Sequence, residues 1–174
     1  MRKTSAAVLI LLLASSVAIA AQDAAHANRG PSTEEERTKA LAMIADLETN
    51  PLGPQAKDER KWLTYWLIEV PDIHVGLCTD LLPDRPKDKN DGAFISTQMM
   101  FSSARYAIQH GGGSSDSVEQ YQAGLEGALK AYEAMLPLHP KDRTPGLDDL
   151  VQRQSASMLA DYVKDRVDKS CKKK

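Results

Sequence analysis

Apolar positions recur along this chain at the three- and four-residue spacing of amphipathic helices. No stretch alternates between apolar and polar residues for long enough to predict a strand. The spacing is cleanest in the fifth predicted helix, where one stripe holds Tyr121, Leu125, Ala128, Leu129, Tyr132, Met135 and Leu136. The pattern therefore predicts an all-α protein with five or six helices.

Capping residues and prolines divide the first half of the chain. Ser32 opens a capping-box pattern and predicts a helix over 32–48. A second helix is expected over 55–70, and Pro71 ends it because the residue before a proline avoids the helical region. Pro71 also suits the first position of a helix, which predicts a short third helix over 71–82.

The second half of the chain has start signals of the same kind. Asp91 can cap the fourth helix, and Asp116 can cap the fifth. Thr144 followed by Pro145 predicts the start of the last helix as its N-cap and first residue. Whether that helix continues through residues 154–157 stays open.

Gly124 and Gly127 interrupt the fifth helix at positions where glycine costs about 1 kcal/mol relative to alanine. Two such residues indicate that another backbone packs closely against this helix. Together with the length of residues 32–171, this favours one helical domain, either an irregular bundle or a set of stacked helix hairpins.

The first twenty residues have the pattern of a secretory signal peptide. Arg2 and Lys3 precede an apolar run, and Ala18 and Ala20 occupy the small positions of a cleavage site. A second possible cleavage site follows Ala27. We therefore expect a soluble, exported protein, periplasmic or secreted, in which residues 21–31 form a flexible lead-in.

The charge pattern excludes some partners. The formal net charge is −2, and removal of the two signal-peptide cations gives −4, with acids and bases dispersed along the chain. This gives no electrostatic footprint for nucleic acid. No stretch after residue 20 approaches the roughly 18 apolar residues of a membrane helix, so stable membrane insertion is not expected. The basic tail 172–174 is interpreted as a solvated end, with a weak contact to a membrane surface as the alternative.

Two cysteines remain after signal cleavage, Cys78 and Cys171. An even number of cysteines in an oxidising compartment usually indicates a disulfide. A bridge between Cys78 and Cys171 would join the last helix to the middle of the chain. Closing a loop of this length contributes about 4–5 kcal/mol to stability in the chain-entropy treatment.

Candidate chemistry is concentrated in residues 66–82. Glu69, Asp72 and His74 are the group to test first for catalysis, although the pattern leans towards no catalytic residue. His74 and Cys78 would share one face of a helix over 71–82, but a zinc site needs three or four ligands and no motif supplies the others. No metal and no cofactor are therefore expected.

A binding surface is expected around Trp62, Tyr65 and Trp66, because the two tryptophans are a large share of the aromatic residues. Tyrosine and methionine at helical spacing elsewhere are interpreted as core positions. The second half of the helix over 55–70 is apolar on most sides, which predicts burial on several faces.

Two resemblances to known proteins extend these predictions. The fifth helix resembles the second helix of a tetratricopeptide repeat, in which Ala128, Tyr132, Met135 and Pro140 occupy the characteristic positions, although no second copy follows at 34 residues. The segments KWLTYWLIEVPDIHVGLC, STQMMFSSARYAI and GLEGALKAYEAML are similar to those of uncharacterised exported bacterial proteins with paired cysteines. The resemblance to the tetratricopeptide repeat implies a helix hairpin. The similarity to the exported proteins implies no activity.

The sequence thus predicts an exported, non-catalytic helical module that binds an unknown protein or a small apolar ligand. One alternative is an enzyme of the cell envelope or extracellular space that uses Glu69, Asp72 and His74. Another is an immunity or inhibitor protein against a secreted toxin, on an analogy of class alone. The oligomeric state is left open.

Overall fold

The computed structural model describes residues 29–112 and 117–171. The predicted signal peptide, the basic tail 172–174 and the predicted cap Asp116 lie outside the described residues. Arg29, within the predicted lead-in, donates hydrogen bonds to Glu36 and Glu69. This arginine therefore joins the start of the first described helix to the end of the second.

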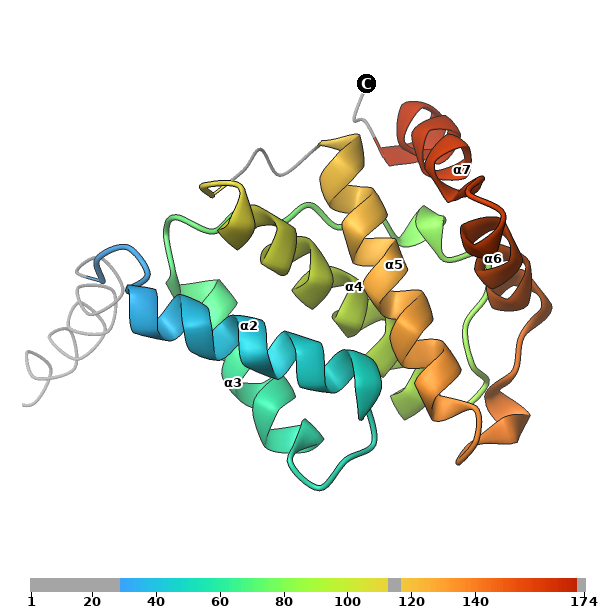
Figure 1. The fold of residues 1–174 in the computed structure, drawn as a ribbon, viewed down its shortest axis with the longest axis horizontal. Coiled ribbons are helices and arrows are strands. Elements are labelled where there is room, and N and C mark those ends of the chain that lie inside the picture. The colour runs from blue at the N-terminus through green and yellow to red at the C-terminus, as the bar shows by residue number, and fades with distance from the viewer. Residues whose placement is uncertain (1–28, 113–116, 172–174) are drawn as a thin grey trace, which may run out of the picture.

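The prediction of an all-α fold is confirmed, and the described residues contain no strand. Six α-helices pack together, with α4 and α5 in the middle, α2 and α3 on one side, and α6 and α7 on the other (Figure 1). Their bounds are α2 Glu34–Thr49, α3 Ala56–Glu69, α4 Lys89–Gln109, α5 Val118–Met135, α6 Pro145–Ser155 and α7 Leu159–Arg166. Two 3₁₀ turns, η1 (Thr79–Leu81) and η2 (Pro140–Asp142), and a π-helical turn, η3 (Val167–Cys171), complete the described elements.

The observed caps differ from several predicted ones by a few residues. Thr33, not Ser32, caps α2 in a capping box with Glu36, because Ser32 is hydrogen bonded to Asp72. Asp88, not Asp91, caps α4 by accepting from the amides of its first turn. Thr144 caps α6 as predicted. Each cap satisfies helix amides that have no partner within the helix.

The predicted helix over 71–82 is wrong. Residues 70–78 are extended, and only the short turn η1 follows. The Gln120 side chain of α5 donates from Nε2 to the backbone oxygen of His74 at 2.8 Å, a bond that holds this extended segment against the bundle. Ile73 is buried in the N-terminal core and Cys78 in the C-terminal core, which favours the extended path between them. The proposed same-face pair of His74 and Cys78 is therefore also wrong.

Two clusters of buried side chains form the core, and α4 contributes to both. The N-terminal core lies between α2, α3 and α4 and contains Ala40, Ile44, Leu47, Ala56, Leu63, Trp66, Val70, Ile73, Phe101, Ala104 and Ala107. The C-terminal core adds α5, α6, α7 and η1 to Ile95 and Met99 of α4. Helix α4 thus contributes to both cores, which agrees with the distribution of its apolar residues nearly all round the helix.

The contact between α4 and α5 is the closest in the bundle, and both α5 glycines lie in it. A Cβ atom at Gly124 would lie 2.7 Å from the backbone oxygen of Met99, and one at Gly127 would lie 2.6 Å from Oε1 of Glu48. Both would overlap serine side chains of α4 as well. The predicted close packing of another backbone is therefore confirmed.

Glu48 of α2 is a buried carboxylate at this same contact. It accepts hydrogen bonds from Ser102 at 2.8 Å and from Arg105 at 2.6 Å, and Lys130 lies 3.5 Å from it. A buried charge is tolerated where it is paired and hydrogen bonded. Glu48 therefore joins α2 to both central helices.

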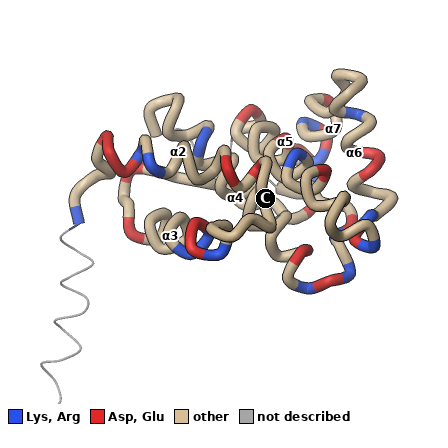
Figure 2. The backbone as a smooth tube through the Cα atoms, turned by 60° about the horizontal axis from the view of Figure 1, so that its bottom comes forward, with Lys and Arg blue, Asp and Glu red and all other residues tan. Residues whose placement is uncertain are grey.

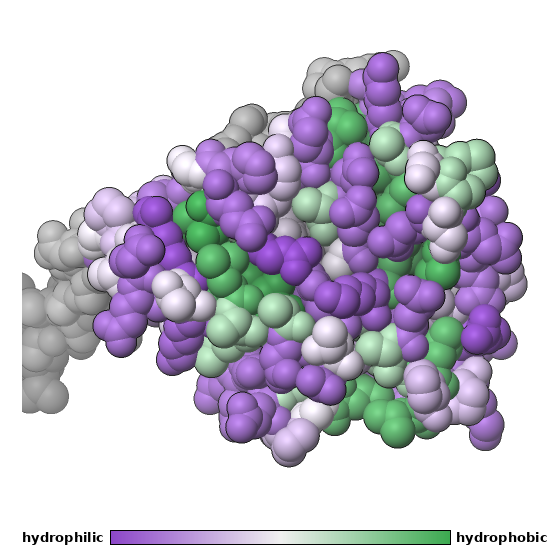
Figure 3. All heavy atoms as spheres, in the orientation of Figure 1, coloured by the Kyte–Doolittle hydropathy of each residue, from purple (hydrophilic) through white to green (hydrophobic). Residues whose placement is uncertain are grey.

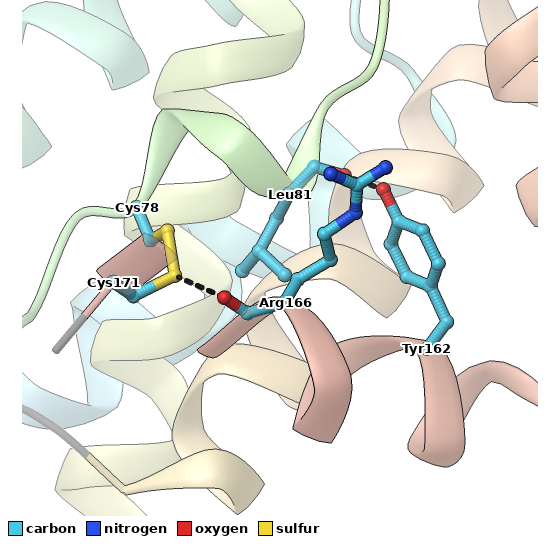
Figure 4. Close-up of a disulfide and its surroundings, with 5 residues drawn as sticks. All are labelled: Cys78, Leu81, Tyr162, Arg166 and Cys171. Carbon is cyan, nitrogen blue, oxygen red and sulfur yellow. Dashed lines mark hydrogen bonds between the residues drawn. A yellow bond between two sulfur atoms is a disulfide. The ribbon is translucent and has the colours of Figure 1, made fainter. Parts of the chain in front are cut away.

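The predicted disulfide between Cys78 and Cys171 is present, with the two Cα atoms 5.4 Å apart (Figure 4). It attaches η3 to the extended segment that precedes η1. Next to it, the hydroxyl of Tyr162 donates to the backbone oxygen of Leu81 at 3.2 Å. The bridge closes a ring that contains α4 to α7, whereas α2 and α3 precede Cys78 and lie outside the ring.

The last predicted helix is divided. Helix α6 ends at Ser155, and α7 begins at Leu159. Ser157 between them has a φ of 60°, in the left-handed region that interrupts a helix. The break lets α7 turn back over the C-terminal core (Figure 1). None of the helices in the described ranges has the length and apolar character needed to cross a membrane.

Candidate ligand-binding site

The structure gives separate partners to the residues first considered for catalysis. Glu69 accepts from Arg29 at 2.8 Å, and Asp72 accepts from Arg37 at 2.8 Å. The His74 side chain is exposed, and its backbone oxygen accepts from Gln120. The acids therefore fasten the start of α2 to the end of α3. Glu69 thus pairs with a residue outside its own helix.

Asp72 provides a pH-dependent contact. Burial favours its neutral form, but hydrogen bonds from the amide and hydroxyl of Ser32 and from Arg37 outweigh burial and lower the pKa of this carboxyl. A carboxyl with a lowered pKa stabilises the fold above its unfolded-state pKa, and that contribution is lost as the pH falls through its folded-state pKa.

We expect Asp72→Asn to lower the free energy of unfolding at neutral pH. The difference from the wild type should stay constant from neutral pH down to about pH 5 and shrink below about pH 4, where the wild-type carboxyl becomes protonated. Urea unfolding followed by circular dichroism across the acidic range up to neutral pH measures this. A difference that does not change with pH would contradict the role of this carboxylate.

The proposed binding residues Trp62, Tyr65 and Trp66 do not share one surface. The Trp66 side chain is buried in the N-terminal core, and the Trp62 ring stacks on it with centroids 5.6 Å apart. Lys39 of α2 covers Trp62 at 4.4 Å. Only Tyr65 is well exposed, at 59%. The two tryptophans are therefore packing residues between α2 and α3.

Tyr65 borders a groove between α3 and α4. The cavity has a volume of about 490 Å³, and its lining is mostly apolar in area with a basic rim. Its residues are Lys57, Arg60, Lys61, Thr64, Tyr65, Ala93, Phe94 and Thr97. The expected burial of α3 on several faces is wrong on this side, because Tyr65 and Ile68 are 59% and 71% exposed. Charges of both signs are otherwise dispersed over the chain (Figure 2).

A larger cavity, of about 910 Å³, lies between the start of α4 and the connection from α5 to α6. Its apolar wall contains Leu52, Phe94, Leu138 and Pro140. Phe94 belongs to both cavities, and the Arg60 guanidinium lies 3.9 Å from its ring centre. The two hollows therefore adjoin at Phe94, and we call them together the Phe94 groove.

An acidic and histidine cluster lies in the wall of the larger cavity. His139 Nδ1 is 2.5 Å from an Asp91 oxygen and 3.5 Å from an Asp142 oxygen. Both aspartates are buried, at 4% and 7% exposure, whereas the histidine side chain is 45% exposed. Asp91 lies in the first turn of α4, His139 directly precedes η2, and Asp142 is the last residue of η2. The cluster therefore joins two distant segments at one edge of the Phe94 groove.

His139 and Asp142 hold protons more strongly than they would in water. The hydrogen bond with Asp91 raises the pKa of His139. A hydrogen bond with Asp91, followed by burial, raises the pKa of Asp142. Two neighbouring carboxyls and one imidazole therefore favour additional positive charge at this position.

The sequence pattern did not indicate this cluster. His139 lies 48 residues from Asp91, and no motif of fixed spacing connects them. The only local signal was a histidine and an aspartate three residues apart around Pro140, in a segment interpreted as a helix end. The Phe94 groove was missed for a related reason, since Phe94 and Leu138 are distant in the sequence and both reach the groove only through the fold.

Comparison with known proteins gave no match: no family model fits the chain, and no curated protein or solved structure is similar to it at the level of a relative.

Proposed function

We propose that this protein is an exported, non-catalytic binding module that holds an extended acidic and apolar segment of a partner protein in the Phe94 groove. The observation that carries the proposal is the pair of adjoining cavities that share Phe94. Their volumes, about 490 and 910 Å³, are in the range of ligand sites in proteins. An elongated hollow of this kind suits several consecutive side chains better than one compact molecule.

Exposed apolar residues support binding at the two ends of the groove. Tyr65 at one end is 59% exposed, and Leu138 at the other is 68% exposed. The view in Figure 3 covers one face of the molecule, where apolar groups are separated by hydrophilic side chains. Apolar and aromatic anchors beside an arginine are typical of residues that dominate binding energy in protein interfaces.

The charge of the smaller cavity, the one that Tyr65 borders, favours acidic residues in a partner. Lys57 and Lys61 on the rim form no ion pair within the described part of the chain, and Arg60 lies over Phe94 between the cavities. The larger cavity is lined by Lys87 and Lys141 but also by Asp88, Asp91 and Asp142, so it adds nothing to this preference. Carboxylates next to apolar side chains in a partner would complement this rim, which increases the association rate and specificity.

The disulfide supports export, because such bonds persist in oxidising compartments. The non-catalytic interpretation is supported by the separate partners of Glu69 and Asp72, each of which has its own arginine. The groove also explains why Tyr65, an aromatic residue at its border, is exposed.

An array of synthetic peptides tests the proposal. Peptides that combine aromatic or aliphatic residues with Asp or Glu should bind, and matched peptides with Lys in place of the acids should not. Tyr65→Ser and Leu138→Ser should each weaken binding at least about tenfold. Met158→Ser is the matched control, because Met158 is also apolar and half exposed but lies between α6 and α7.

NMR chemical shifts of the labelled protein would locate the bound peptide. Changes should be concentrated at Tyr65, Phe94 and Leu138. The proposal fails if the array shows no preference for acidic and apolar peptides, or if Tyr65→Ser and Leu138→Ser bind as tightly as the wild type.

A further inference from the structure

We infer that Asp91, His139 and Asp142 form a binding site for one divalent transition-metal ion of the zinc class. The three side chains offer one imidazole nitrogen and two carboxylate oxygens, and these atoms all lie within 4.8 Å of one another. Ligand atoms around a tetrahedral zinc ion are about 3.3 Å apart, given bonds of about 2.0–2.1 Å. Small movements of the side chains would therefore bring the three atoms to coordinating distance.

The backbone holds these ligands in position. The His139 amide donates to Met135 at 2.9 Å, which continues the last turn of α5, and the Asp142 amide donates to His139 at 3.0 Å. Asp91 is fixed in the first turn of α4, whose amides are capped by Asp88. A site of this kind needs little rearrangement to accept an ion, which favours binding.

The charges of the cluster favour a cation. His139 Nδ1 can carry one hydrogen, and yet it faces two buried carboxylates. The hydrogen on Nδ1 therefore serves Asp91, at 2.5 Å, more closely than Asp142, at 3.5 Å. Arg60 is a cation outside the cluster that interacts with Asp91. A divalent ion would neutralise both carboxylates at once.

The donor set selects the class of metal. Calcium takes six to eight oxygen ligands, and magnesium keeps several waters in an all-oxygen octahedron, so an imidazole donor does not favour either. One nitrogen and two oxygens suit zinc, with manganese or cobalt as weaker fits. The three protein ligands leave a fourth position for water or another ligand, and all three residues line the larger cavity of the Phe94 groove.

This site stands on the cluster itself and does not depend on the peptide-binding proposal. Equilibrium dialysis of the purified protein against micromolar Zn²⁺, followed by elemental analysis, should give one zinc per chain. Excess Mg²⁺ or Ca²⁺ should leave that zinc bound. Cobalt(II) should give the intense visible absorption of a tetrahedral site, which a loosely associated ion would not produce.

Variants separate this cluster from other zinc ligands. His139→Ala and Asp142→Asn should each weaken zinc binding by more than the about 10–100-fold typical of outer-shell changes. His74→Ala and His110→Ala are matched controls, because both histidines are exposed and lie outside the cluster, and they should bind zinc as the wild type does.

His139 is the decisive position because its half-exposed side chain can be truncated without opening the core, and circular dichroism should show an unchanged fold. If Asp142→Asn does not fold, His139→Ala and His139→Gln still test the site. The inference is overturned if the wild type binds no zinc at micromolar concentration, or if zinc stays bound at one per chain in folded His139→Ala. Peptide binding without zinc binding would overturn this inference and leave the proposed function intact.

Discussion

Replacing Gly127 by alanine is expected to lower the free energy of unfolding by about 2 kcal/mol or more, although alanine favours a helix by about 1 kcal/mol. The added methyl group would overlap the Ser102 side chain and come within 2.6 Å of Oε1 of Glu48. It would thus separate α4 from α5 and disturb a buried carboxylate that three helices share. Urea unfolding measures the change.

A double-mutant cycle isolates this contact. Ser102→Gly removes the side chain that the new methyl group would meet, so the pair Ser102→Gly with Gly127→Ala should be more stable than the two single effects predict. If the effects of the two substitutions on stability simply add, the overlap is relieved by movement elsewhere in the fold. A Gly127→Ala variant as stable as the wild type would contradict the close approach of α4 and α5.

Removing the disulfide is expected to cost about 4–5 kcal/mol, because the bridge joins residues separated by 93 positions and restricts the unfolded chain. Cys78→Ser combined with Cys171→Ser should therefore unfold at much lower urea concentration than the oxidised protein. Hydrogen exchange should rise most in α7 and η3, which the bridge holds against the C-terminal core.

The reduced wild-type protein is the matched control for the double serine variant. Both proteins lack the cross-link and differ only in the side chains at positions 78 and 171. Their urea unfolding midpoints should therefore agree closely. A reduced protein as stable as the oxidised one would show that the unfolded chain gains little freedom from reduction, contrary to the expectation.

The features that were best predicted from the sequence depend on local pattern. The stripe on α5 and the two glycines within it identify a helix with a close neighbour, because a 3.6-residue period and the absence of a Cβ act within one element. The cysteine pair was predictable for another reason, since only one pairing of two cysteines exists. The predicted number of helices matches the structure partly because two errors cancel. The helix predicted over 71–82 is extended, and the last predicted helix is divided at Ser157.

The features that escaped prediction depend on contacts between distant segments. Residues 70–78 are extended because Ile73, Cys78 and the backbone of His74 find partners in different parts of the bundle. No local sequence pattern indicates such partners. Tyr65 and Trp66 are adjacent and both aromatic, but which of them faces the core depends on the position of α2. The cluster that contains His139 is likewise a product of tertiary packing.

The covalent ring from Cys78 to Cys171 gives the protein two parts with different tethers. The hairpin of α2 and α3 is anchored by the N-terminal core and by Glu48, with no cross-link of its own. This hairpin is therefore expected to separate from the rest of the fold first during unfolding. Tyr65 belongs to this hairpin, whereas Phe94 and Leu138 belong to the ring. A bound peptide that contacts all three residues would therefore hold the hairpin and the ring together.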